Sequence, residues 1–143
     1  IGKVYPNLVS TVDGDANETS GIRLPFITVP LATHMGWNLR HPDIGGADQV
    51  IGTGGASGGT LRGSSIPFAA TPNDRKMSGD SRLSIEERYA SKEQYLELVE
   101  QAARKLVALR YLLEEDVESI KNQATQHYDF FVSRAVESQS AGD

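Results

Sequence analysis

Cysteine is absent from this sequence, tryptophan occurs once, and long apolar runs are missing. Without cysteine the chain can form neither disulfide bonds nor thiolate metal sites. No run approaches the roughly 18 consecutive apolar residues that a membrane-spanning helix needs. The net charge is −5, and Lys and Arg form no cluster of the kind that binds nucleic acid. We therefore expect neither nucleic acid nor a membrane as a partner, while the compartment stays open.

The 143 residues suffice for one domain with a buried core, although only 38% of them are hydrophobic. By composition the chain divides into four parts: extended, proline-bounded segments (1–43), Gly/Ser-rich and polar loops (44–82), helical patterns (83–136) and a tail (137–143). We expect an α+β fold, in which a β-hairpin and an irregular loop region precede a C-terminal helical hairpin.

The expected β-hairpin lies near the N-terminus. Residues 5–12 have the β-branched content of a strand, and residues 13–18 supply Asp, Gly and Asn for a turn. The run Ile22–Val29 then returns along the first strand. Within it, Phe26–Val29 lies between two prolines and is rich in β-formers, which predicts a short strand at a sheet edge.

The turn has part of the pattern of a calcium site. Asp13, Asp15 and Asn17 have the alternate spacing of a calcium loop, but Glu18 and Leu24 stand where such loops carry glycine and glutamate. A plain turn is therefore the favoured interpretation, and no metal site is expected. The same turn contains an Asn-x-Thr glycosylation sequon at Asn17, which matters only in a eukaryotic secretory route.

A second motif lies in the glycine-rich region. Residues 55–59, Gly-Ala-Ser-Gly-Gly, match the G-x-S-x-G pattern of a nucleophile elbow. Such an elbow needs a strand before the serine and a helix after it. The residues that follow cannot start a stable helix, so a flexible linker is favoured and Ser57 is a weak nucleophile candidate. The polar stretch Thr71–Arg82 is also expected to be loop.

Two capping boxes open the helical part. Ser84-Ile85-Glu86-Glu87 predicts a short turn of helix that ends near Tyr89, and Ser91-Lys92-Glu93-Gln94 predicts a longer helix from Lys92. The longer helix has one apolar stripe, formed by Tyr95, Leu98, Val99, Ala102, Leu106 and Leu109. A second helix is headed by the acidic residues 114–116 and has the stripe Val117, Ile120, Ala124, Tyr128, Phe131 and Ala135. Two such helices predict a hairpin that covers an apolar surface.

The residues provide only weak candidates for a site. His34 is the strongest histidine because polar and aromatic groups surround it in sequence, yet no serine or carboxylate is placed beside it. His41 is expected in an exposed loop and His127 beside the apolar stripe. Trp37 is expected in the core; the functional alternative makes it the wall of an apolar substrate pocket, with Asn38 as an orienting donor. The sequence contains no H-E-x-x-H or H-x-x-E-H pair for zinc, and no cofactor is expected.

Several short sequence motifs occur in a fixed order along the chain. They include Tyr5-Pro6-x-Leu8-Val9, Gly21-Ile22-Arg23-Leu24-Pro25, Val29-Pro30-Leu31-Ala32-Thr33, Gly36-Trp37-Asn38-Leu39-Arg40 and Ser84-Ile85-Glu86-Glu87-Arg88-Tyr89. Together they resemble the C-terminal part of a bacterial family of alpha/beta hydrolase domain-containing proteins. The resemblance covers nearly the whole chain, from about Val4 to Tyr128. It departs at Ser10, where the family has proline, and at His34, where it has tyrosine.

Members of that family are several times longer, with the nucleophile and the catalytic histidine on the N-terminal side of the matching part. The resemblance thus implies that this chain is a C-terminal segment of an α/β-hydrolase-like fold. It would give scaffold and pocket wall to a serine-type ester or amide hydrolase, with the remainder of the hydrolase polypeptide and a small ester or amide as partners. A non-catalytic interaction module that docks a partner through its helical hairpin is the alternative from another class.

Overall fold

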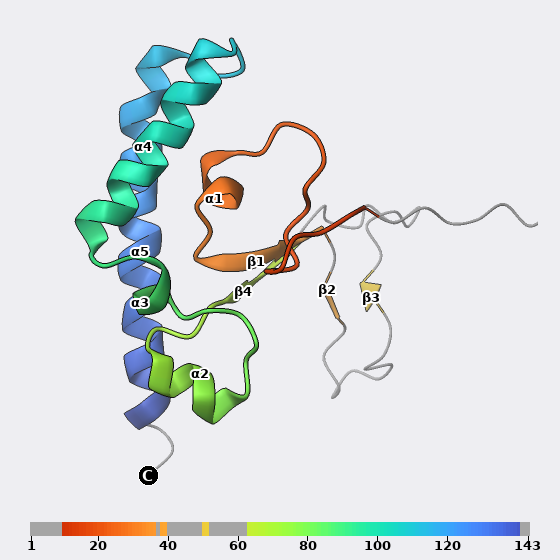
Figure 1. Cartoon of the computed structure of the whole chain (residues 1–143), viewed down its shortest axis with the longest axis vertical. Helices are drawn as coiled ribbons and strands as arrows, with labels where there is room; N and C mark the ends of the chain where they lie inside the picture. The colour runs from red at the N-terminus through yellow and green to blue at the C-terminus, as the bar shows by residue number, and fades with distance from the viewer. Residues whose placement is uncertain (1–9, 37, 40–49, 52–62, 141–143) are drawn as a thin grey trace, which may run out of the picture.

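The computed structural model describes residues 10–36, 38, 39, 50, 51 and 63–140. In chain order the elements are α1 (Pro25–Thr28), β1 (Ala32–Met35), β2 (Asn38–Leu39), β3 (Val50–Ile51), β4 (Ser64–Pro67), α2 (Pro72–Ser78), α3 (Ile85–Arg88), α4 (Lys92–Ala108), a 3-10 turn (Glu114–Asp116) and α5 (Val117–Ser140). Figure 1 shows α4 and α5 side by side along one side of the molecule, with α1 next to α4 and the β1–β4 pair leading away from the helices. The arrangement is α+β.

The strands form two small antiparallel sheets. β1 pairs with β4, so that Ala32 lies opposite Pro67 and Met35 opposite Ser64. β2 pairs with β3 in a second two-stranded sheet. Because β1 and β4 come from distant parts of the sequence, their pairing joins the N-terminal region to the segment that leads into α2.

The predicted strand Phe26–Val29 is wrong, and with it the predicted return strand of the β-hairpin. These residues form the single helical turn α1, in which the Val29 N–H donates to the Pro25 carbonyl at 2.8 Å. Pro25 occupies the first turn, where its fixed φ suits a helix and its missing N–H costs nothing. The turn at residues 13–18 is present, closed by an isolated bridge between Val12 and Glu18. The first predicted strand begins outside the described residues.

The stretch Thr71–Arg82, predicted to be loop, contains the helix α2. Thr71 accepts a hydrogen bond from the Asp74 N–H, and the Asp74 carboxylate accepts one from the Thr71 N–H, which completes a capping box. Pro72 begins the helix, and Gly79 ends it with a left-handed φ of 69°. These are ordinary start and stop signals, so the sequence already contained this helix.

The helices of the C-terminal part begin where their capping residues predict. The Ser84 and Glu87 box starts α3, and the Ser91 hydroxyl accepts from the Gln94 N–H at the start of α4. The Gln94 side chain does not complete the second box; its oxygen accepts from the Ala90 N–H instead. Helix α5 continues to Ser140, four residues into the segment expected as a tail.

The core lies between α1, β1, α3 and the helical pair. Its buried members are Val29, Leu31, Phe68, Ile85, Tyr89, Tyr95, Val99 and Ala124. Both predicted helical stripes contribute to it, although Leu109 at the end of the first stripe is 54% exposed. Three tyrosine rings cluster at the centre: the Tyr95 ring lies edge-on to that of Tyr89, 5.1 Å away between centroids, and tilted against that of Tyr128, 5.4 Å away. Within the described residues, no helix is both long and apolar enough to cross a membrane.

Gly63→Ala should destabilise the β1–β4 pair. A Cβ at position 63 would overlap the backbone oxygen of Met35, which cannot move without breaking the end of β1. We expect the free energy of unfolding to fall by about 1–3 kcal/mol, as for other overpacked sites. Gly36→Ala is the matched control, because a Cβ there meets nothing within 4 Å. Urea unfolding followed by circular dichroism should separate the two variants; equal stability would contradict the close approach.

Candidate functional site

A histidine and a serine meet on the β1–β4 pair. His34 in β1 lies opposite Ser65 in β4, and His34 Nδ1 is 2.9 Å from Ser65 Oγ. The His34 side chain is half-buried and that of Ser65 is exposed. The sequence identified His34 as a candidate but did not indicate a partner for it, because Ser65 is 31 residues away and follows the glycine-rich region. The pairing of β1 with β4 alone brings them together.

The environment of His34 keeps its ring neutral. Burial lowers the pKa of His34 below its ordinary value of 6.5, and the electrostatic interaction with His127 lowers it further. A neutral imidazole can accept a proton from a hydroxyl, which is the property that a general base requires. His127 reaches this region from α5, where its ring lies 5.3 Å from that of Phe26.

The lowered pKa predicts acid sensitivity. Between pH 6.5 and the folded-state pKa of His34, the unfolded chain binds more protons than the folded one, so the free energy of unfolding should fall as the pH falls below 6.5. In an NMR titration the His34 ring should titrate below pH 6.5. His127→Gln should raise the pKa of His34 only part of the way, because burial is the larger cause. A pKa unchanged by His127→Gln would contradict the interaction between the two histidine charges.

In the described part of the chain, His34 lacks two features of a catalytic centre: a carboxylate that orients its ring and a serine at a strand-to-helix turn. A catalytic histidine is held by a carboxylate on one ring nitrogen while the other faces the nucleophile. Among the described side chains, no carboxylate bonds to the His34 ring. Ser65 lies within a strand, and the chain continues through Phe68 and Ala70 before α2 begins, so it is not at a strand-to-helix elbow. The pair is a cross-strand contact and not a complete triad.

Asn17 anchors β1 from the turn. Its side chain is fully buried; Oδ1 accepts from the His34 N–H at 2.8 Å, and Nδ2 donates to the Ala32 carbonyl at 3.1 Å. The amide thereby satisfies two backbone groups of β1 that β4 does not pair. An enclosed Nδ2 with this bond cannot carry a glycan in the folded chain, so the sequon has a structural use here.

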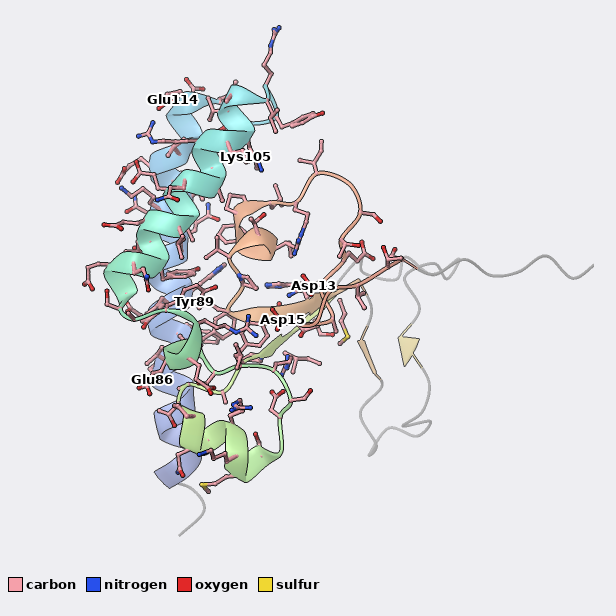
Figure 2. All side chains as sticks on the ribbon, in the orientation of Figure 1. Asp13, Asp15, Glu86, Tyr89, Lys105 and Glu114 are labelled. Carbon is pink, nitrogen blue, oxygen red and sulfur yellow. The ribbon has the colours of Figure 1, made fainter. Side chains whose placement is uncertain are left out.

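Two carboxylates of the turn, those of Asp13 and Asp15, are bonded within the protein. Asp13 Oδ1 accepts from the N–H groups of Asp15 and Asn17, each at 3.0 Å, and Asp13 Oδ2 pairs with Arg23 at 2.8 Å. Asp15 forms a two-pronged ion pair with Arg88, 73 residues further along the chain. Figure 2 shows Asp13 and Asp15 close together beside β1. These bonds fit the plain-turn interpretation, and within the described residues no group of three or more His, Asp or Glu could hold a metal ion.

An arginine cluster that the sequence did not predict fixes the other side of β1 and β4. Arg82 donates to Thr33 Oγ1 at 2.7 Å and to the backbone of β4, and Asp80 holds its guanidinium. The hydrogen bond from Arg82 lowers the pKa of Asp80. Arg82 and Arg88 both lie over the ring of Phe68, with 5.0 and 4.1 Å to the centroid. The sequence motif Ser84–Tyr89 lies in this region, but it did not indicate which residues the arginines contact.

The remaining sequence candidates are less well placed. Trp37, His41 and Ser57 lie outside the described residues. Asn38 pairs with Ile51 through its backbone in β2, and its side chain is also outside the described part. The proposed roles of Trp37 as a wall and Asn38 as a donor therefore stay predictions.

A pocket opens beside α1. It has a volume of about 600 Å³ and lies between the segment before α1 and the C-terminal end of α4. Its lining consists of Gly21, Ile22, Arg23, Thr28, Ala102, Lys105, Leu106, Leu109 and Tyr111. The volume falls in the range of small-molecule sites, which is about 300–1,000 Å³. The sequence did not predict this pocket, because its walls come from segments about eighty residues apart in the chain.

The elements of the candidate site lie within one family match. The sequence from residue 5 to residue 122 matches the model of a family described as Alpha/beta hydrolase domain. The chain belongs to this alpha/beta hydrolase domain family. The match contains the His34–Ser65 pair, the arginine cluster and the pocket, and it ends within α5. No curated protein and no solved structure shows a significant match to the chain.

Membership of the alpha/beta hydrolase domain family agrees with the resemblance that the short sequence motifs indicated. It assigns a hydrolase-type fold to this region, in which the described strands and helices are α+β. The functional groups themselves belong to the individual site and not to the fold. The chemistry of this member of the family therefore depends on its own residues.

Proposed function

We propose that this chain is the C-terminal segment of a serine-type ester or amide hydrolase, in which it gives scaffold and part of the pocket wall. The alpha/beta hydrolase domain match over residues 5–122 carries this proposal. The geometry of the His34–Ser65 pair supports a nucleophile and base outside this chain, because no described carboxylate orients His34 and Ser65 lies inside a strand. The attacking serine and its base then belong to polypeptide outside these residues.

The proposed reaction is acyl transfer. A serine from the remainder of the hydrolase attacks the carbonyl of a small ester or amide, and backbone N–H groups stabilise the oxyanion that forms. This chain supports that site by anchoring β1 through Asn17 and by joining β1 to β4 through Arg82. Trp37 and Asn38 come shortly after β1 in the sequence, and in this proposal they form the apolar wall and the orienting donor of the substrate pocket.

The alternative of an interaction module needs an unused apolar face on the helical hairpin. In the described residues, the stripe positions Tyr95, Val99 and Ala124 are buried in the core, so the central part of both stripes is already covered, while Leu109 at the end of the first stripe is exposed. The proposal of a hydrolase segment is therefore preferred.

The test compares this chain with the longer polypeptide in which it is proposed to occur. Both should be assayed on nitrophenyl butyrate and treated with a fluorophosphonate probe, which labels activated serines. We expect hydrolysis and a labelled serine only in the longer polypeptide, with the label outside these 143 residues. Ser65→Ala in the longer polypeptide should leave kcat unchanged within about twofold, as for a residue that does not touch the reacting atoms.

Two results would overturn the proposal. One is labelling of Ser57 or Ser65 by the probe, which would place the nucleophile in this chain. The other is steady esterase turnover by the chain alone that His34→Gln abolishes. A longer polypeptide without any labelled serine or activity would instead support the interaction module.

A further inference from the structure

The pocket between the segment before α1 and the end of α4 has no assigned ligand. We propose that it binds a monocarboxylate with an apolar chain or ring, held by Lys105 and Arg23. This binding does not depend on the proposed hydrolysis, although an ester or amide hydrolase would release an acid of this class.

The apolar part of the proposed ligand has a matching surface. Leu106 forms the buried floor of the pocket, and the lining residues Ile22, Leu109 and Tyr111 are 55%, 54% and 59% exposed. Large apolar side chains that are grouped around a concave site and half-exposed are typical of a ligand site. A chain or ring of the ligand would remove their exposed surface from water.

The turn after α4 presents Tyr111 to the pocket at a conformational cost. Arg110 has a φ of 64°, in the left-handed region that side chains other than glycine rarely adopt. The Tyr111 N–H then donates to the Leu106 carbonyl at 2.9 Å, which closes the helix end. A left-handed residue followed by a hydrogen bond of this kind is a common way for a helix to end. The backbone at the end of α4 therefore sets the position of Tyr111, the aromatic residue of the pocket wall.

The polar part of the lining is positive. Of its nine residues, Arg23 and Lys105 are cationic and none is acidic, although the whole chain carries a net charge of −5. The Lys105 side chain makes no hydrogen bond or ion pair within the described part of the chain, and Figure 2 places it on α4 across from the segment before α1. Its ammonium is thus free to meet a carboxylate.

Arg23 supplies a second cationic group to the lining. Its Nη2 donates to Asp13 Oδ2 at 2.8 Å and to the Ile27 carbonyl at 2.9 Å, which holds the guanidinium in place. Its Nε is buried and has no hydrogen-bond partner in the described residues. Because that atom is buried, the carboxylate would be held at Lys105, while the Arg23 guanidinium, whose side chain is 31% exposed, adds a positive group to the same wall.

The experiment is a titration of the full chain with octanoate, followed by NMR and by calorimetry. We expect shifts of backbone signals confined to residues that line the pocket. Lys105→Met should weaken octanoate binding about tenfold, the size of one charge-assisted hydrogen bond. Lys76→Met is the matched control, because Lys76 is an exposed lysine on α2, far from the lining residues, and should leave binding unchanged.

Two further measurements separate the apolar part from the charge. Octanol should bind about tenfold more weakly than octanoate and should not respond to Lys105→Met, since it lacks the charge. Leu109→Asn should weaken both ligands, and because Leu109 is exposed the variant should fold normally.

The proposal would be overturned if octanol and octanoate bound alike, if the signal shifts were scattered over the surface, or if no saturable binding occurred at millimolar octanoate. Sedimentation provides a last check. Self-association that Leu109→Asn abolishes would show that a second copy of the chain covers this face, and it would also overturn the proposal.

Discussion

Tyr95→Ala is expected to lower the free energy of unfolding by about 3–5 kcal/mol, the usual range for truncating a large buried aromatic side chain. The Tyr95 side chain is 1% exposed and lies between the rings of Tyr89 and Tyr128. Its removal leaves a cavity where α3, α4 and α5 meet, and the helix backbones cannot close around it. Because single domains have total stabilities of about 5–15 kcal/mol, the variant should be largely unfolded near its former melting temperature.

Urea unfolding, followed by circular dichroism at the helical minimum, measures this change. Tyr111→Ala is the matched control, because Tyr111 is 59% exposed and should cost less than about 1 kcal/mol. Tyr95→Phe separates the ring from the hydroxyl and should retain most of the stability. Equal midpoints for Tyr95→Ala and Tyr111→Ala would show that the cluster of three tyrosines is not the centre of the core.

Asn17→Ala is expected to cost about 2–4 kcal/mol, because it leaves two buried backbone groups without partners. These are the N–H of His34 and the carbonyl of Ala32, which Asn17 bonds at 2.8 and 3.1 Å. The loss should be local to β1 and the turn at residues 13–17. The His34 amide should therefore exchange its hydrogen with solvent much faster in the variant, at a rate that NMR can follow.

Asn73→Ala is the control for this change, since Asn73 is exposed on α2 and lies away from β1. Asn17→Asp provides a sharper comparison. It keeps an acceptor for the His34 N–H but removes the donor to Ala32 and buries a charge, so it should be at least as destabilising as Asn17→Ala. Unchanged exchange at His34 in both Asn17 variants would show that β1 does not depend on this side chain.

Local signals in the sequence were sufficient for most helices. The Ser84–Glu87 box, the Ser91 cap and the apolar periodicity located α3, α4 and α5, because caps and stripes involve residues within one or two turns of each other. Helix α2 has signals of the same kind in Thr71, Pro72, Asp74 and Gly79, so its omission was an error of interpretation and not a limit of the sequence.

The error at Phe26–Val29 has a different cause. Pro25 is compatible with an edge strand and equally with the first turn of a helix, and β-branched content favoured the strand. Tertiary packing decided between them, since α1 places Val29 in the core and Phe26 against it. For a segment of four residues, local preference is weaker than the packing of two side chains.

The candidate site shows the same division. His34 could be singled out from its neighbours in the chain, but Ser65 could not, because 31 residues and the glycine-rich region separate them. The bonds of Asn17 to β1, of Arg88 to Asp15 and of Arg82 to Thr33 join residues 15 to 73 positions apart. Contacts of this range leave no periodic trace in a single sequence, because any loop length can bring the partners together.

By itself, the sequence determined the helix starts, the helical stripes and membership of the alpha/beta hydrolase domain family. These depend on residues close together along the chain or on motifs in a fixed order. Only the tertiary structure decided that β1 pairs with β4, that the buried Asn17 amide and Arg82 hold these strands, and that a positive, apolar-walled pocket opens beside α4. The reason is physical. Sites and strand pairs are made by chain segments that meet only after folding, whereas caps and stripes act before it.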